Sequence, residues 1–152
     1  MPDKLFTQQS FIYKVNPDLG ELDWDYICEL FARVNWRTRS AEELRKAFTT
    51  GSWRLFVYQD EQLVGFGRTI DDGRYYAMLG DVIVDPDFQG QGLGKEIVNR
   101  LNALLQDYHF VTLTAAPGKG DFYTSLGWKK QTTAFIWPQG PKQLRQHCER
   151  EE

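Results

Sequence analysis

The sequence is poor in the features that mark several classes of protein. Its 152 residues contain only two cysteines, Cys28 and Cys148, too few for the disulfide framework of a small secreted domain. The net charge is −3, whereas a general nucleic-acid binder usually carries a basic excess. No apolar run approaches the length of a membrane span, and Met1–Gln9 does not resemble a signal peptide. We therefore expect a cytoplasmic protein with reduced thiols and with neither a nucleic-acid nor a membrane partner.

Internal repeats, low-complexity tracts and linkers rich in Pro, Gly or Ser are also missing, so we expect one domain over residues 1–152. Hydrophobic residues make up 41% of the chain, which is enough to build a core and argues against disorder. The polar residues 139–152 are expected to form a mobile tail. No cluster of Cys, His, Asp and Glu has metal-ligand spacing, so we expect no metal.

Hydrophobic periodicity predicts a mixed α/β (α+β) fold with helices on both faces of a sheet. Helices are expected at residues 24–34, 41–48, 93–108 and 121–126. Strands are expected at residues 11–15, 53–58, 63–69, 75–84, 110–114 and 132–137. Asp23 and Ser40 stand where the first two helices need a capping side chain. The 75–84 run is apolar enough to be buried on both faces. A helix-spanned crossover joins it to 110–114, so these two strands are expected to be parallel.

A glycine-rich segment lies between the 75–84 strand and the next helix. It reads Gln89-Gly90-Gln91-Gly92-Leu93-Gly94. Glycines let backbone N–H groups approach a ligand closely, and the helix start adds unpaired donors. The segment therefore indicates a phosphate or pyrophosphate site, with a glycine-rich turn that binds nothing as the alternative. It is not a P-loop, because Glu96 stands where Ser or Thr is required, nor a dinucleotide fingerprint, because Lys95 replaces the third glycine.

Two motifs in this order resemble those of the GNAT superfamily of acetyltransferases. Gln89–Gly94 resembles the family signature (Gln/Arg)-x-x-Gly-x-(Gly/Ala), and Phe122–Trp128 resembles Phe-Tyr-x-x-x-Gly-Phe with Trp128 in place of the last Phe. The element order is similar over nearly the whole chain. Gly80–Pro86 with the glycine segment looks similar to the cyanobacterial and chloroplast branch, which includes plastid arylalkylamine and protein lysine acetyltransferases. The resemblance implies a mostly antiparallel sheet flanked by helices, with a splayed parallel strand pair at the coenzyme site.

The resemblance also implies an N-acetyltransferase with acetyl-CoA as co-substrate and an amine as acceptor. Backbone groups of the strand would hold the pantetheine arm, and backbone amides of the loop would hold the pyrophosphate. The coenzyme-binding residues expected on this basis are Val82, Ile83, Val84, Gln89, Gly90, Gln91, Gly92, Leu93, Gly94, Lys95 and Phe122. Tyr123 stands where the family keeps the general acid that protonates the departing coenzyme thiolate; a core tyrosine is the alternative.

The general base and the acceptor are less explicit. Asp81 interrupts an apolar strand beside the coenzyme segment, so it is our candidate base, with a hydrogen-bonded structural Asp or ordered water as the alternatives. An aromatic acceptor pocket is expected from the side chains Trp24, Tyr26, Trp36, Arg37 and Phe135. Each of these aromatic residues has core packing as its alternative. A flat groove would instead suit a protein lysine or an N-terminal amine.

Two classes of function stay open at this point. The first is an amine acetyltransferase, which the presence of Tyr123 favours. The second is a non-catalytic coenzyme-A-binding module that acts as a sensor or interaction domain. Dimers are frequent in the superfamily, so a homodimer stays open as well.

Overall fold

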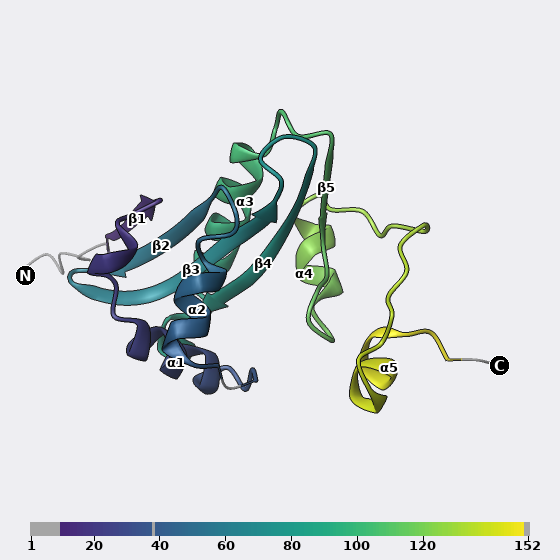
Figure 1. The fold of residues 1–152 in the computed structure, drawn as a ribbon, viewed down its shortest axis with the longest axis horizontal. Coiled ribbons are helices and arrows are strands. Elements are labelled where there is room, and N and C mark those ends of the chain that lie inside the picture. Colours follow the sequence, from purple (N-terminus) through teal and green to yellow (C-terminus); the bar gives the residue numbers. More distant parts are fainter. Residues whose placement is uncertain (1–9, 38, 151–152) are drawn as a thin grey trace, which may run out of the picture. The chain divides into compact units, whose positions relative to one another are not determined.

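The computed structural model describes residues 10–37 and 39–150, so the Met1–Gln9 stretch lies outside the described residues. The internal contacts divide the chain into a first unit, Met1–Leu113, and a second, Thr114–Glu152. A single domain over residues 1–152 stays a prediction. The first unit contains a five-stranded sheet in the order β1-β2-β3-β4-β5 (Figure 1).

The helices and strands follow the predicted order through the first unit. Its elements are β1 (Phe11–Val15), the 3-10 helix η1 (Leu19–Glu21), α1 (Trp24–Arg33), α2 (Ala41–Ala47), β2 (Arg54–Gln59), β3 (Gln62–Asp71), β4 (Tyr76–Val84), the 3-10 helix η2 (Pro86–Phe88), α3 (Leu93–Leu104) and β5 (Phe110–Leu113). The second unit contains α4 (Gly120–Ser125) and α5 (Pro141–His147).

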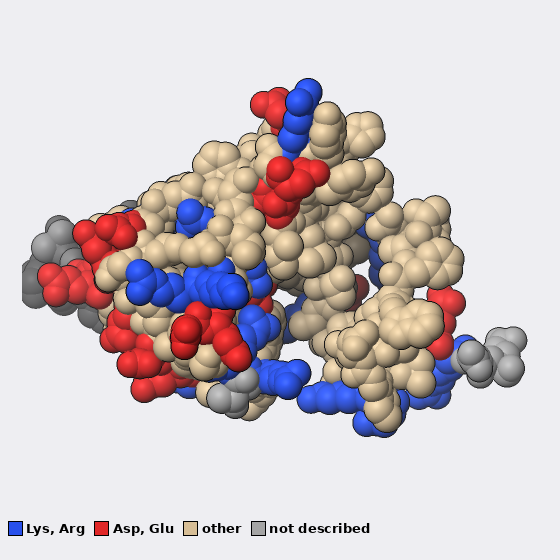
Figure 2. Space-filling view, viewed as in Figure 1, with Lys and Arg blue, Asp and Glu red and all other residues tan. Residues whose placement is uncertain are grey.

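Both predicted helix caps are confirmed. The Asp23 carboxylate accepts a hydrogen bond of 3.1 Å from the Tyr26 N–H at the start of α1. The Ser40 hydroxyl accepts one of 3.1 Å from the Glu43 N–H at the start of α2. Each cap satisfies a donor that the first helical turn would otherwise leave unpaired. Helix α2 carries acids in its first turn and bases in its last, and basic and acidic side chains are interleaved over α1 and α2 in Figure 2.

Helices cover the two faces of the sheet. On one face, α1 and α2 pack against a core that includes the fully buried rings of Phe31, Phe48 and Phe66. Side chains alternate between faces along a strand, so Gly67 faces the other side, where α3 lies (Figure 1). A Cβ at Gly67 would stand 2.9 Å from the Ile97 side chain of α3. Glycine at this position therefore lets α3 approach the sheet closely.

The predicted strand directions are confirmed. Strands β1 to β4 pair antiparallel, and β4 pairs with β5 in parallel. The expectation that β4 is buried on both faces along its length is wrong. Its residues alternate between buried and partly exposed, because successive side chains of a strand point to opposite faces and only part of each face is covered.

The second unit departs most from the sequence expectations. The predicted strand at Thr132–Trp137 is wrong: this segment has no regular secondary structure, and the Phe135 side chain is 100% exposed. β-branched and aromatic residues favour a strand, but a strand also needs a neighbour to pair its backbone. Residues 139–152, expected as a mobile polar tail, contain helix α5, which begins with Pro141 in its first turn, a position that suits proline.

Candidate active site

Strand β4 runs past the end of its parallel partner. Strand β5 pairs with β4 only from Tyr76 to Leu79, whereas β4 continues to Val84. The last five residues of β4, Gly80–Val84, are therefore not paired with β5. Backbone N–H and C=O groups on such an edge are available to an extended ligand. This is the segment that contains Val82, Ile83 and Val84, the expected partners of the pantetheine arm.

A β-bulge interrupts β4 at the start of this segment. The pairing with β3 joins Phe66 to Ile83 and Arg68 to Gly80, so Asp81 and Val82 together face the single residue Gly67. Asp81 has a φ of 52°, in the left-handed region that costs a residue with a side chain some strain. A bulge leaves one residue outside the ladder and re-aims its neighbours.

The turn after β4 is held by ion pairs. Asp85 is fully buried, caps η2 through the Asp87 N–H at 2.9 Å and accepts from Arg33 of α1 at 2.9 Å. The second terminal nitrogen of Arg33 donates to Asp87 at 3.1 Å, and this hydrogen bond raises the pKa of Arg33. The exposed Gln89 donates through Nε2 to the Val84 carbonyl at 3.1 Å. The path from the strand into the glycine segment is therefore fixed by contacts with α1 and with β4.

The glycine segment has the geometry of a phosphate cradle. Gly90 and Gly92 have φ angles of 81° and 83°, and a Cβ at either would meet no heavy atom within 4 Å. Within the described part of the chain, no side chain caps the first turn of α3, which begins at Leu93. Its N–H groups are thus free for an anion, which the helix dipole also favours. These features fit a pyrophosphate group, and Gln91, Gly94 and the exposed Lys95 lie in the same segment.

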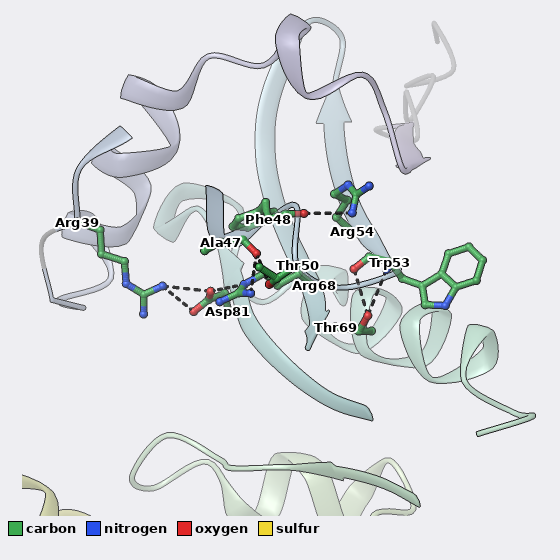
Figure 3. Close-up of polar contacts among 9 residues, drawn as sticks. All are labelled: Arg39, Ala47, Phe48, Thr50, Trp53, Arg54, Arg68, Thr69 and Asp81. Atoms are coloured by element: carbon green, nitrogen blue, oxygen red, sulfur yellow. Dashed lines mark hydrogen bonds and ion pairs between the residues drawn. The ribbon is translucent and has the colours of Figure 1, made fainter. Parts of the chain in front are cut away.

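The carboxylate of Asp81 lies among arginines (Figure 3). Arg68 donates from Nε to Oδ2 at 2.7 Å, and Arg39 donates from one terminal nitrogen to both oxygens at 3.1 Å. The Asp81 side chain is only 7% exposed. Its oxygens are thus engaged by two cations, and this arrangement favours the structural alternative for Asp81 over its role as a base. Neither arginine partner could be identified from the sequence, because they lie 42 and 13 positions away.

Tyr123, the expected general acid, lies in α4 of the second unit together with Phe122. The two rings meet edge to face with centroids 5.0 Å apart. Tyr123 is half-buried, and this partial burial raises the pKa of its phenol above the ordinary value. A raised pKa keeps the phenol protonated, which is the state that an acid needs.

The expected acceptor residues separate into different environments. Trp24 is buried, donates from its indole N–H to the Leu19 carbonyl at 2.9 Å and packs edge to face on Phe48. The core-packing alternative therefore holds for Trp24. Trp36 is half-buried with its ring 5.8 Å from that of Phe31. Arg37 is exposed, as Phe135 is in the second unit.

Tyr26 lines a pocket, but the other lining residues are not among those expected for the acceptor. The pocket has a volume of about 480 Å³ and lies in the first unit. Its lining consists of Glu21, Asp23, Tyr26, Tyr58, Glu61, Gln62 and Leu63. Burial raises the pKa of Tyr58, and the two tyrosine rings share the lining with three carboxylates. Such a lining suits a cationic group.

The described residues contain neither a metal-binding cluster nor a membrane-spanning helix. No group of three or more His, Cys, Asp or Glu side chains within residues 10–37 and 39–150 is placed to hold a metal ion. In the same residues, every helix is too short or too polar to cross a membrane.

Known proteins match this chain in sequence and in fold. The acetyltransferase (GNAT) domain family matches residues 27–136. A ycf52-like N-acetyltransferase of Prochlorococcus marinus is 32% identical over 127 residues, which are 80% of this chain and 69% of that protein. The chloroplastic serotonin N-acetyltransferase 2 of Oryza sativa subsp. japonica is 34% identical over 123 residues, 75% of this chain and 60% of that protein. A solved GNAT-family acetyltransferase of Streptococcus pneumoniae has a TM-score of 0.71 at 21% identity, over 85% of this chain and 98% of that one.

Proposed function

The chain belongs to the GNAT family of acetyltransferases, and on this premise we propose that it transfers the acetyl group of acetyl-CoA to a primary amine. The observation that carries the proposal is the run of unpaired strand edge, bulge and uncapped helix start between Gly80 and Lys95. An extended arm and a pyrophosphate are the two parts of coenzyme A that such a run suits. Bound acetyl-CoA supplies an acetyl thioester to be attacked.

The proposed coenzyme contacts use mainly the backbone. The N–H and C=O groups of residues 82–84 pair with the pantetheine arm as an added strand would. The N–H groups from Gly90 to Lys95 bind the pyrophosphate at the start of α3. The open space beside Gly90 and Gly92 supports this assignment, because a ligand can reach the backbone there.

The proposed chemistry is direct attack. The amine, once neutral, attacks the acetyl carbon, the carbon–sulfur bond breaks, and the Tyr123 hydroxyl gives its proton to the sulfur. The raised pKa of Tyr123 supports this role, since the phenol stays protonated across the neutral range. An ordered water takes the proton from the amine, because both oxygens of Asp81 accept hydrogen bonds from arginines.

Two acceptor classes follow from the relatives and from the pocket. The rice relative is named for serotonin, an arylalkylamine, and the tyrosine-lined acidic pocket around Tyr26 suits a cation with an aromatic part. A protein lysine is the other acceptor. That relative is also named as chloroplastic, whereas a cytoplasmic location of this chain, like a homodimer, stays a prediction.

The test is release of free thiol from acetyl-CoA in the presence of arylalkylamines, polyamines, aminoglycosides and lysine peptides. We expect turnover with at least one class and binding of acetyl-CoA without any acceptor. Binding without turnover across the panel would favour the non-catalytic module. Failure of the chain to bind acetyl-CoA would refute both.

A further inference from the structure

A cluster of three charged side chains lies at the bulge of β4 (Figure 3). Asp81 is at its centre, with its carboxylate 2.7 Å from Nε of Arg68 and 3.1 Å from a terminal nitrogen of Arg39. The side chains of Asp81 and Arg68 are 7% and 11% exposed. The Asp81–Arg68 pair is therefore largely removed from water, whereas Arg39 is 33% exposed. A buried ion pair is screened little, and the loss of one partner leaves a buried charge.

The two arginines connect the bulge to both helices on that face of the sheet. Arg68 also donates to the carbonyl of Ala47, the last residue of α2, at 3.1 Å, and its guanidinium lies 5.3 Å from the centre of the Phe48 ring. Arg39 precedes α2, and its guanidinium lies 4.6 Å from the centre of the Phe31 ring of α1. A shift of the Asp81 carboxylate would thus disturb two arginines whose other contacts reach α1 and α2.

The backbone at Asp81 needs such support. Its φ of 52° is unfavourable for a residue with a side chain, and such a conformation persists only where surrounding contacts impose it. On the neighbouring strand β3, Gly67 lies opposite the bulge and packs closely against α3, so β3 has little room to move. The ion pairs on one face and α3 on the other therefore impose the bulge.

We propose that Asp81 is a positioning residue of the coenzyme site: held by Arg68 and Arg39, it fixes the bulge at Asp81–Val82 and so sets where the backbone groups of residues 82–84 point. The inference rests on the proposed function for the coenzyme contacts, but the bulge itself is independent of it. The proposed role of Asp81 differs from that of a base, because both of its oxygens accept hydrogen bonds from arginines.

The experiment compares Asp81→Gly with Asp81→Ala in the full chain. Both remove the carboxylate, but only glycine adopts a positive φ without strain. Titration calorimetry measures acetyl-CoA affinity, and hydrogen exchange measures protection of the amides of residues 80–84 without ligand. We expect Asp81→Ala to bind acetyl-CoA about tenfold more weakly than the wild type, and Asp81→Gly to recover a large part of that loss. Amide exchange over residues 80–84 should be slowest in the wild type, faster in Asp81→Gly and fastest in Asp81→Ala.

Arg68→Gln and Arg100→Gln form the matched control pair. Each removes one arginine ion pair of the first unit, but Arg100 pairs with Glu96 on the surface of α3 and lies over the Tyr13 ring of β1, the strand at the opposite edge of the sheet from β5. We expect Arg68→Gln to speed exchange over residues 80–84 and Arg100→Gln to leave it unchanged. This pair also decides the question if Asp81→Ala does not fold.

Three results would overturn the inference. One is equal acetyl-CoA affinity of the wild type, Asp81→Gly and Asp81→Ala. Another is unchanged exchange over residues 80–84 in Arg68→Gln. The third is a turnover loss that is the same in Asp81→Gly and Asp81→Ala and that removes the acidic limb of the pH–rate profile, since this is the behaviour of a base. A wild-type chain without acetyl-CoA affinity would refute the proposed function, whereas the exchange measurements would still test the bulge.

Discussion

The two family motifs of this chain lie in regions of very different construction. The first, from β4 through the glycine segment to α3, is built on buried and hydrogen-bonded residues, with Asp81, Ile83, Asp85 and Leu93 all buried. The second lies in α4, a helix of six residues that contains no buried residue. Downstream of α4, Phe135 and Trp137 are 100% and 86% exposed.

The difference shows which parts of the chain coenzyme binding and acetyl transfer would each depend on. A coenzyme cradle made of backbone groups depends on strand pairing, glycines and a helix start, all of which lie within one continuous stretch of sequence. An acid and an acceptor pocket depend on side chains from separate segments. Substitutions in the first region should therefore change the affinity for acetyl-CoA, and substitutions in the second should change turnover.

The largest effect is expected from Tyr123→Phe, which removes only the phenolic hydroxyl. We expect kcat to fall by about a hundredfold or more, in the range of general acid catalysis, while the dissociation constant of acetyl-CoA stays the same. Steady-state kinetics and calorimetry on one preparation measure both quantities. Unchanged turnover would remove Tyr123 from the reaction.

The pH dependence follows from the raised pKa of Tyr123. The acid is active while protonated, so its contribution to turnover is lost only as pH rises through the raised value, above the ordinary phenol pKa of about 10. The wild type should show no loss of kcat between pH 7 and pH 9 from this group. A basic limb in that interval that disappears in Tyr123→Phe would show that the pKa of Tyr123 is not raised, although the residue would still be the acid.

In the first region, Gly92→Ala tests the phosphate cradle. The new Cβ strains a backbone held at a φ of 83° and stands among the N–H groups that we assign to the pyrophosphate. We expect acetyl-CoA to bind about tenfold more weakly. Gly73→Ala is the matched control, because Gly73 has a φ of 84° in the turn that precedes β4. It should cost similar stability without changing the affinity, and equal losses of affinity in the two variants would count against the cradle.

A smaller effect on stability alone is expected at the other end of the sheet. Burial would raise the pKa of Asp71, but hydrogen bonds from Ser52, Thr69 and Tyr108 outweigh it and lower the pKa to about 2. A folded-state pKa below the unfolded value stabilises the fold fully above about pH 4, and this contribution is lost as pH falls toward 2. We expect Asp71→Asn to cost about 1 kcal/mol at pH 7, after allowance for solvent screening, with the difference shrinking below pH 4.

Denaturant unfolding at pH 7 and pH 3 measures this difference. Asp107→Asn, at an exposed carboxylate in the turn after α3, is the control and should change stability little at either pH. Acetyl-CoA affinity should stay unchanged in both variants. A constant difference between Asp71→Asn and the wild type from pH 7 to pH 3 would show that the loss does not come from the ionised carboxylate.

Local signals made much of the first unit predictable. The caps Asp23 and Ser40 and the glycine segment each act on residues within a few positions, so sequence spacing alone places them. The parallel pairing of β4 and β5 followed from the helix between them. These features can be predicted without knowing which distant residues lie beside them in the fold.

Features that depend on distant partners were not predictable in this way. The bulge at Asp81 exists because two residues face the single Gly67, and a sequence pattern does not give the register between strands. Arg39 and Arg68 reach Asp81 from other elements. The strand expected at Thr132–Trp137 failed for a related reason, since its composition favours extended backbone but does not supply a pairing partner.

That segment also gives the smallest expected effect, through Phe135→Ser. A side chain that is 100% exposed contributes little to the folded state, so the free energy of unfolding should change by less than about 0.5 kcal/mol. Denaturant unfolding of the variant and the wild type measures it. A loss above about 1 kcal/mol would mean that the ring is buried in solution, as it would be if residues 132–137 paired as the strand that their composition favours. A rise in the acceptor KM without a loss of stability would instead support the place of Phe135 in the acceptor pocket, because a ring that contacts only the substrate affects binding and not folding.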